Sequence, residues 1–369
     1  MDALLIGTGG ASGWPEPGCS CASCLRARSS GTSRAAGQVV VDGSLTLRPG
    51  LAPEPAGPIA RHQVRAVPGG WDITGPDGGR LLAAAGPGQV PAPPDGTRPF
   101  DLALLDLLAS PAQLGRLRAA GLVQPHASVA ALYTDHRVTS AAELARRCDL
   151  WGATAGRDGQ LIAGPDPAAA RAGQVRPHRT LIVGGARSGK SREAELRLAG
   201  EPAVTYLAAG PWADDSWAGA DGEPDAEWAA RVATHQAARP SWWRTEETLD
   251  LAGALRGEAG AVLIDGIGTW LAAIMDQAGA WPDPAGAWPD PAGPPQAIVA
   301  ARIDELISAW RQTRALVVAV TDQVGSGLVP PYPAGRAFRD ELGWLNQRLA
   351  AESDLSLLAV AGRILTLPA

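Results

Sequence analysis

The stretch "GGARSGKS", residues 184–191, constrains the fold of this chain more than any other stretch. It fits the pattern G-x4-G-K-[ST], with a short apolar run before it and an amphipathic segment after it. In this pattern glycines let backbone N–H groups turn toward a phosphate, and the next helix adds its positive dipole end. The sequence therefore predicts a phosphate-binding loop between a strand and a helix. Its predicted members are Gly184, Gly185, Ala186, Arg187, Ser188, Gly189, Lys190 and Ser191.

Lys190 is the only lysine among the 369 residues. In a chain that otherwise uses arginine, a lysine persists mainly where a compact ammonium fits and a planar guanidinium does not. We expect Lys190 to reach the β- and γ-phosphates of a nucleotide and Ser191 to bind Mg²⁺. The metal also needs an acid at the end of another strand. Asp265 in "AVLIDG" and Asp322 in "VVAVTDQ" both qualify, and we favour Asp265.

Apolar segments alternate with helical patterns from residue 179 onward. Fully apolar strands separated by helices predict a mostly parallel sheet with helices on both faces. The predicted strands are "TLIVGG", "AVTYLAAG", "AVLIDG", "ALVVAVTD" and "LSLLAVAG". The predicted helices follow the phosphate loop and include 225–238, 296–314 and 335–352.

The chain divides at a Pro/Ala/Arg-rich segment without apolar periodicity, which predicts a linker. We therefore expect an N-terminal domain over 1–163, a linker over 164–178 and a nucleotide-binding domain over 179–369. The N-terminal half is less regular, and residues 48–100 are rich in Pro and Gly. "ALLIGTGG" and "FDLALLDLL" predict strands, and "SAAELARRCDLWG" predicts a helix.

Composition narrows the partners and the compartment. A net charge of -6 argues against a nucleic-acid surface, which needs clustered basic residues. The opening "MDALLIGTGG" does not fit a signal peptide, and no run is long enough to span a membrane. Three of the four cysteines lie in "GCSCASC", a spacing typical of metal ligands rather than of a secreted disulfide framework. We expect a cytoplasmic protein.

The order of several motifs after residue 179 carries a family resemblance. "GGARSGKS", "YLAAG", "DAEWAARVATHQAARPSWWRTEE", "LIDGIGTWL", "VTDQVGSGLVP" and "GRAFRDELGWLNQRLA" occur in that order. Together they resemble the bifunctional adenosylcobinamide kinase/adenosylcobinamide-phosphate guanylyltransferases. The resemblance implies a RecA-like P-loop fold and a homo-oligomer.

The resemblance also implies a two-step reaction. ATP or GTP phosphorylates the aminopropanol hydroxyl of adenosylcobinamide; GTP then gives GMP to a histidine, from which the substrate phosphate takes it. His235 in "RVATHQAARP" matches that histidine, and a neutral imidazole is a competent nucleophile near pH 7. Arg231 and Arg239 lie four residues to either side and could steady phosphate charge. Lys190, Asp265 and His235 are thus the expected catalytic residues.

Two departures from the family pattern leave alternatives open. Asp322-Gln323 stands where Asn-Glu is expected, and Ala273 where an asparagine is common. These changes put the base or the substrate contacts in doubt. The alternatives are a P-loop kinase for another small molecule, or a nucleotide-binding regulatory module whose N-terminal half docks a partner.

The N-terminal half resembles metallo-β-lactamase-fold phosphodiesterase-like proteins through "LLIGTGGASGWPEPGCSCASCLRAR", "DITGPDGGRLL", "FDLALLDLL" and "TDHRVTSAAELARR". The H-x-H-x-D-H cluster of hydrolytic members is missing, and "VPGG" and "AAAGPG" stand where metal ligands are expected. We therefore expect a truncated, non-catalytic α+β domain. In some of these proteins cysteines at this spacing help hold a structural zinc. Here Cys19, Cys21 and Cys24 would need a fourth ligand, which His136 or Cys148 could supply.

Overall fold

The computed structural model describes residues 1–56, 61–84, 98–165, 178–210, 239–283 and 293–368. The chain forms two compact units. One consists of Met1–Arg176 with Ala199–Pro202, and the other of Pro177–Leu198 with Ala203–Ala369. In the described part of the chain, no helix combines the length and the apolar character needed to cross a membrane.

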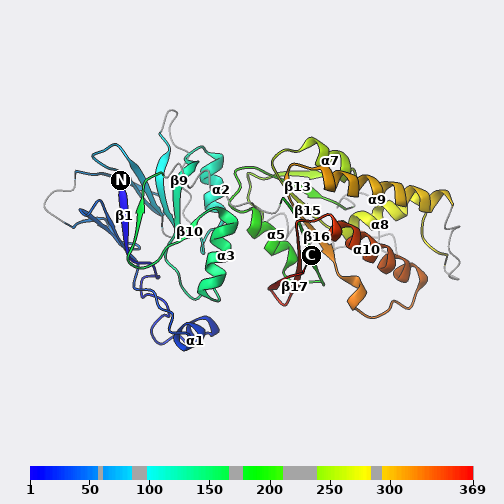
Figure 1. The fold of residues 1–369 in the computed structure, drawn as a ribbon, viewed down its shortest axis with the longest axis horizontal. Coiled ribbons are helices and arrows are strands. Elements are labelled where there is room, and N and C mark those ends of the chain that lie inside the picture. Colours follow the sequence, from blue (N-terminus) through cyan, green and yellow to red (C-terminus); the bar gives the residue numbers. More distant parts are fainter. Residues whose placement is uncertain (57–60, 85–97, 166–177, 211–238, 284–292, 369) are drawn as a thin grey trace. The chain divides into compact units, whose positions relative to one another are not determined.

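The C-terminal unit is built on a seven-stranded sheet with the order β14-β13-β15-β16-β12-β17-β18 (Figure 1). All neighbouring strands are parallel except the β17–β18 pair. The strands are β12 (Arg179–Gly184), β13 (Val204–Ala208), β14 (Arg244–Glu247), β15 (Ala261–Asp265), β16 (Leu316–Asp322), β17 (Leu355–Val360) and β18 (Arg363–Thr366). The five strands that the sequence predicts are all present, and the mostly parallel sheet is confirmed.

Helices cover both faces of this sheet, as predicted. One hydrophobic cluster joins α5 (Lys190–Leu198) to one face. A larger cluster joins the other face to α7 (Leu251–Gly257), α8 (Ile267–Ala278), α9 (Pro294–Gln312) and α10 (Pro333–Ala351), and the short η1 (Val324–Ser326) precedes α10. The predicted helix over 225–238 lies outside the described residues. Because the central strands are buried from both sides, they need the continuous apolar runs seen in the sequence.

The N-terminal unit contains two sheets packed on each other. The first has the order β11-β1-β2-β3-β4, and the second has the order β10-β9-β8-β7-β6-β5. The first is made of β1 (Asp2–Gly7), β2 (Gln38–Val41), β3 (Leu45–Leu47), β4 (Glu54–Pro55) and β11 (Gln160–Ala163). The second is made of β5 (Gln63–Val67), β6 (Gly70–Thr74), β7 (Arg80–Ala84), β8 (Phe100–Leu105), β9 (Val123–Ala131) and β10 (Thr154–Ala155).

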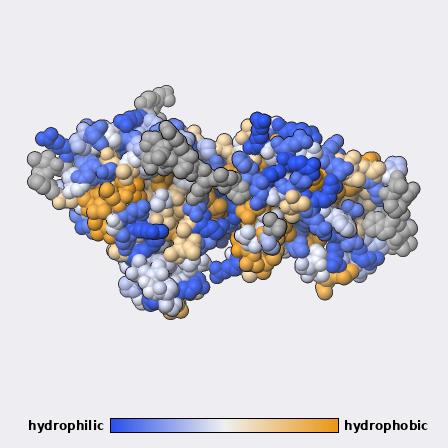
Figure 2. Space-filling model, in the orientation of Figure 1, coloured by the Kyte–Doolittle hydropathy of each residue, from blue (hydrophilic) through white to orange (hydrophobic). Residues whose placement is uncertain are grey.

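One core lies between these two sheets. It combines Leu5 and Val41 from the first sheet with Leu81, Leu104 and others from the second. Of the three helices α1 (Ala22–Ser29), α2 (Ala112–Ala119) and α3 (Ala141–Trp151), α2 contacts β9 and α3 contacts β10. Leu4, Ile6 and Leu161 of the first sheet stay 36%, 42% and 60% exposed. Figure 2 shows hydrophobic surface in the part of this unit where Figure 1 has β1.

Residues 48–100 are more regular than their composition suggests. They contain β5, β6 and β7, which pair antiparallel in chain order. Gly70 pairs with Val67 and Ala84 in this ladder. Only glycine fits there, because a Cβ would collide with the backbone oxygen of Ala83. Cross-strand pairing of this kind leaves only a weak signal in a segment whose strands are short and interrupted by glycine.

Replacement of Trp310 by alanine tests the core of the C-terminal unit. Trp310 is fully buried on α9, and its indole N–H donates to Ser353 Oγ at 3.2 Å. Trp310→Ala should lower the free energy of unfolding by about 3–5 kcal/mol, because it leaves a cavity. Trp344→Ala, at a side chain that is 63% exposed on α10, is the matched control and should cost less than about 1 kcal/mol. Equal urea midpoints for the two variants of the full chain would contradict this packing.

Candidate nucleotide-binding site

The predicted phosphate loop joins β12 to α5 at the carboxyl edge of the sheet. Gly184 has no room for a side chain, since a Cβ would come within 2.5 Å of Ser188 Oγ and 2.7 Å of the Ala359 carbonyl oxygen. Gly189 and Arg187 have φ angles of 97° and 55°. Backbone in these left-handed conformations turns successive N–H groups toward one point, which favours an anion. Ser188 is buried, whereas Gly185 and Arg187 are exposed.

The Lys190 side chain lies under this loop and is only 9% exposed. Its ammonium donates to the Gly185 carbonyl oxygen at 3.1 Å and pairs with Asp322 Oδ1 at 2.9 Å. Asn346 of α10 fixes the end of β16, because its amide donates to the Asp322 carbonyl oxygen and accepts from Thr321 Oγ1. The single lysine thus lies directly after the loop, and Asp322, the second strand-end acid, neutralises it.

Asp265 lies at the end of β15, within reach of the loop. Ser191 Oγ donates to Asp265 Oδ1 at 3.4 Å, and the Tyr206 hydroxyl donates to Asp265 Oδ2 at 2.5 Å. Burial and the neighbouring Asp265 carboxylate raise the pKa of Tyr206, so its hydroxyl keeps its proton. Hydroxyl and carboxylate oxygens are the ligands that Mg²⁺ prefers. The donor chemistry of Ser191 and Asp265 therefore fits the predicted metal ion.

Arg239 stacks on this group of residues. Its guanidinium carbon lies 3.3 Å from the centre of the Tyr206 ring, a cation–π contact. The buried Arg239 Nε has no hydrogen-bond partner in the described part of the chain. Arg239, Tyr206 and Asp265 thus form a continuous contact path to the phosphate loop.

Glu195 is one turn after Ser191 on α5. Burial, and then repulsion from Asp265, raise the pKa of Glu195 to about 7, while Arg239 and Arg192 oppose the shift. Sequence analysis did not select Glu195 or Tyr206. The signals for them are the i, i+4 spacing of Ser191 and Glu195, and a phenol near the end of an otherwise apolar strand.

The remaining residues named from the sequence are not part of this contact path in the described ranges. His235 and Arg231 lie outside the described residues. Ala273, one of the two departures, is buried in α8, and the Gln323 amide donates to Ser326 Oγ.

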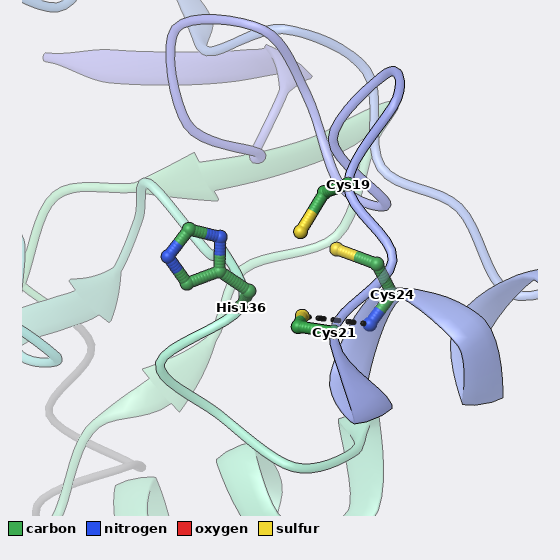
Figure 3. A group of neighbouring side chains, drawn as sticks. All are labelled: Cys19, Cys21, Cys24 and His136. Carbon is green, nitrogen blue, oxygen red and sulfur yellow. Dashed lines mark hydrogen bonds between the residues drawn. The ribbon is translucent and has the colours of Figure 1, made fainter.

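A second group of side chains gathers in the N-terminal unit (Figure 3). One ligand atom from each of Cys19, Cys21, Cys24 and His136 lies within 4.8 Å of the others. His136 follows β9, whereas the cysteines lie at the start of α1. Cys148, the alternative fourth ligand, is buried in α3 and is not in this group.

The chemistry of this group fits zinc. A tetrahedral zinc with bonds to sulfur of about 2.3 Å holds its sulfurs about 3.8 Å apart, so only small shifts are needed. Cys21 caps α1 and accepts the Cys24 backbone N–H, which lowers the pKa of Cys21 to about 7. Burial instead raises the pKa of Cys24 to about 11. His136 Nδ1 also contacts Glu16 at 3.1 Å, a carboxylate that can orient the ring.

Glu195→Gln should change how stability depends on pH in metal-free protein. Between its ordinary pKa of 4.5 and about 7, native Glu195 holds a proton that the unfolded chain releases. The free energy of unfolding should therefore fall as pH rises through this window, and Glu195→Gln should remove that part of the slope. Urea unfolding with EDTA at several pH values measures it, and Glu305→Gln at an exposed site of α9 is the control. The same slope in wild type and Glu195→Gln would refute the assignment.

Comparison with known proteins adds to this geometry. Residues 180–367 match the family described as "Cobinamide kinase / cobinamide phosphate guanyltransferase". The "Bifunctional adenosylcobalamin biosynthesis protein CobU" of Salmonella typhimurium is 39% identical over 191 residues, which are 49% of this chain and 95% of that protein. The protein CobP of Pseudomonas aeruginosa, with the same description, is 36% identical over 190 residues, which are 50% of this chain and 94% of that protein.

A solved structure gives only a weak likeness. This structure is described as "Structural and biochemical analysis of a prototypical ATPase from the type III secretion system of pathogenic bacteria". It has a TM-score of 0.30 and 13% identity, and the overlap covers 49% of this chain and 51% of that one. This likeness is too low to support an argument about fold or function.

The family match coincides with the C-terminal unit that carries Lys190, Ser191 and Asp265. The relatives are covered almost from end to end, so the match extends well beyond the phosphate loop. The chain belongs to the cobinamide kinase/cobinamide phosphate guanyltransferase family.

Proposed function

We propose that residues 179–369 form a RecA-like domain that phosphorylates adenosylcobinamide and then converts it to adenosylcobinamide-GDP. ATP or GTP supplies the phosphoryl group, and GTP supplies the GMP. One observation carries this proposal: after β12, Lys190 pairs with Asp322 and Ser191 contacts Asp265, each acid at the carboxyl end of another strand of the same sheet, inside the region that matches the family. Ligands of open parallel sheets bind at that edge.

The residues of the phosphate loop each have a task in this proposal. The loop N–H groups and the start of α5 bind the phosphates, and the Lys190 ammonium neutralises part of their negative charge. Ser191 and Asp265 hold Mg²⁺, which screens the phosphate charge when bound. Tyr206 keeps Asp265 oriented through its 2.5 Å hydrogen bond. Asp322 shares Lys190 with the phosphates and fixes the direction of the ammonium.

We propose His235 as the residue that carries GMP. An imidazole nitrogen would form a bond to the α-phosphorus as pyrophosphate leaves, and the phosphate of the substrate would then displace the imidazole. Arg239, four residues later in the sequence, supports this proposal because it stacks on Tyr206 beside Asp265. We propose that the Arg231 guanidinium binds the same phosphates.

The N-terminal unit, which we delimit as 1–163 before a linker at 164–178, is proposed to be a truncated metallo-β-lactamase-like domain without hydrolytic activity. Two sheets that share one core, with α2 and α3 against the second sheet, support this proposal. We propose a structural zinc on Cys19, Cys21, Cys24 and His136. The four free cysteines favour a reducing compartment such as the cytoplasm, and a homo-oligomer stays a prediction from the family resemblance.

Labelling with α-³²P-GTP tests guanylyl transfer. Wild type should acquire acid-labile, base-stable label, and His235→Ala should lose it by at least about 100-fold, since no second nucleophile replaces a covalent carrier. His178→Ala, at an exposed histidine ahead of β12, is the control and should label normally. Unlabelled wild type that still binds GTP tightly would exclude the transferase.

A kinase assay with adenosylcobinamide separates the remaining alternatives. Phosphorylation of adenosylcobinamide without labelling of the protein would indicate a kinase that lacks guanylyltransferase activity. GTP binding with neither activity would indicate a regulatory module. Lys190→Arg should lose phosphorylation despite keeping its charge, because the planar guanidinium does not fit the buried site.

Zinc content tests the cysteine group. Dialysed wild type should hold about one zinc per chain, and Cys21→Ser should hold much less, because a structural site needs all four ligands. Cys148→Ser, which changes a cysteine outside the group, should keep its zinc. Elemental analysis makes the measurement, and equal zinc in wild type and Cys21→Ser would refute the site.

A further inference from the structure

A cavity in the N-terminal unit is not used by any function described above. Its volume is about 280 Å³, and its lining includes Arg48, Ala66, Gly70, Trp71, Ala83 and Tyr133. Strands β7, β8 and β9 are neighbours and run parallel. Ala83 lies at the carboxyl end of β7, and Tyr133 lies two residues after the end of β9. The cavity thus occupies the edge of a parallel sheet at which ligands usually bind.

Tyr133 is the first of two side chains that could recognise a ligand. It is only 7% exposed, and its hydroxyl has no hydrogen bond to any residue in the described ranges. The ring is thus buried while the hydroxyl has no protein partner among the described residues and lines the cavity, where it can donate to a ligand. Burial and the negative charge of Asp106 raise the pKa of Tyr133 to about 12, so the hydroxyl is a donor.

The backbone at Tyr133 is also unusual. Its φ angle of 61° is in the left-handed region, which a bulky side chain rarely adopts. Gly37 lies opposite, and a Cβ there would come within 2.9 Å of Tyr133 Cδ1. Non-glycine residues held in this region are concentrated at ligand sites, where the surroundings compensate for the strain.

The walls of the cavity determine the shape and charge of a ligand. Trp71 is held by a hydrogen bond from its indole N–H to the Leu51 carbonyl oxygen, and glycines 50, 69 and 70 contribute lining without side chains. Arg48 brings a guanidinium that pairs with Glu54 at 2.6 Å on the surface. Among the described residues, the lining has no His, Cys, Asp or Glu side chain that would suit a metal ion. The side-chain donors Tyr133 and Arg48 favour a ligand with an anionic acceptor.

We propose that this cavity binds a small planar aromatic carboxylate. The ring would lie against the mostly apolar lining beside Trp71, and the carboxylate would accept hydrogen bonds from Tyr133 and Arg48. The volume is near the lower limit for ligand sites, about 300 Å³, and therefore suits one or two rings. All described residues that line the cavity belong to the N-terminal unit, whereas the nucleotide site belongs to the C-terminal unit.

Fluorescence anisotropy of 2-aminobenzoate with the full-length protein tests the proposal. Wild type should bind it saturably, and the uncharged analogue 2-aminobenzamide should bind at least about 10-fold more weakly, because a charged acceptor makes the stronger hydrogen bond. Tyr133→Phe should weaken 2-aminobenzoate binding about 5–10-fold through loss of one hydrogen bond. Arg48→Met, at the surface, should weaken 2-aminobenzoate but not 2-aminobenzamide, and it serves as the test if Tyr133→Phe does not fold.

A bulky substitution tests the location. Ala66 is exposed on β5 and lines the cavity, so Ala66→Trp should block it and abolish binding. Ala145→Trp, at an exposed position of α3, is the matched control and should bind like wild type. Excess GTP should not displace the probe. The proposal is overturned by absence of saturable binding to wild type, by unchanged binding to Ala66→Trp, or by displacement with GTP.

Discussion

The pairing of the buried Lys190 ammonium with Asp322 is the interaction on which the nucleotide site depends. A charge that is largely removed from water is costly unless a partner compensates it. Lys190 follows β12 and Asp322 ends β16, and these strands are direct parallel neighbours with Gly184 opposite Asp322. The strand order of the sheet is therefore also what allows a lysine to be buried beneath the phosphate loop.

A separate chain of polar contacts begins at Ser191, the residue after Lys190, and extends across the sheet. Asp265 ends β15, on the far side of β16 from the loop strand, and Tyr206 comes from β13, the next strand out. Arg239 then covers Tyr206. Each contact restricts the next side chain, so a change at Arg239 should reach the proposed metal ligands without touching them. This is a reason to expect coupled effects from substitutions in this group.

A strand could be predicted from the sequence when both of its faces are buried, and was missed when it lies at the edge of the sheet. The central strands β12, β13, β15, β16 and β17 were predicted, because burial on both faces demands apolar runs. The edge strands β14, with the sequence "RTEE", and β18 were missed, because an edge exposes polar side chains and carries no such run. Local patterns pointed to Lys190, Ser191 and Asp265 as candidates, whereas Tyr206 and Glu195 join the candidate site only through contacts between distant segments.

The two units concentrate polar groups at strand ends for the same physical reason. The interior of a parallel sheet cannot accept unpaired polar atoms, so polar side chains that meet a ligand are placed where strands end. In the C-terminal unit those positions carry Lys190, Asp265 and Asp322; in the N-terminal unit they carry Asp106 and Tyr133. The Asp106 carboxylate accepts from Arg137, whereas the Tyr133 hydroxyl lines the cavity and is one of the two donors proposed to meet a ligand there. Since each unit has its own hydrophobic core, a substitution at one of these edges should leave the other unit's edge intact.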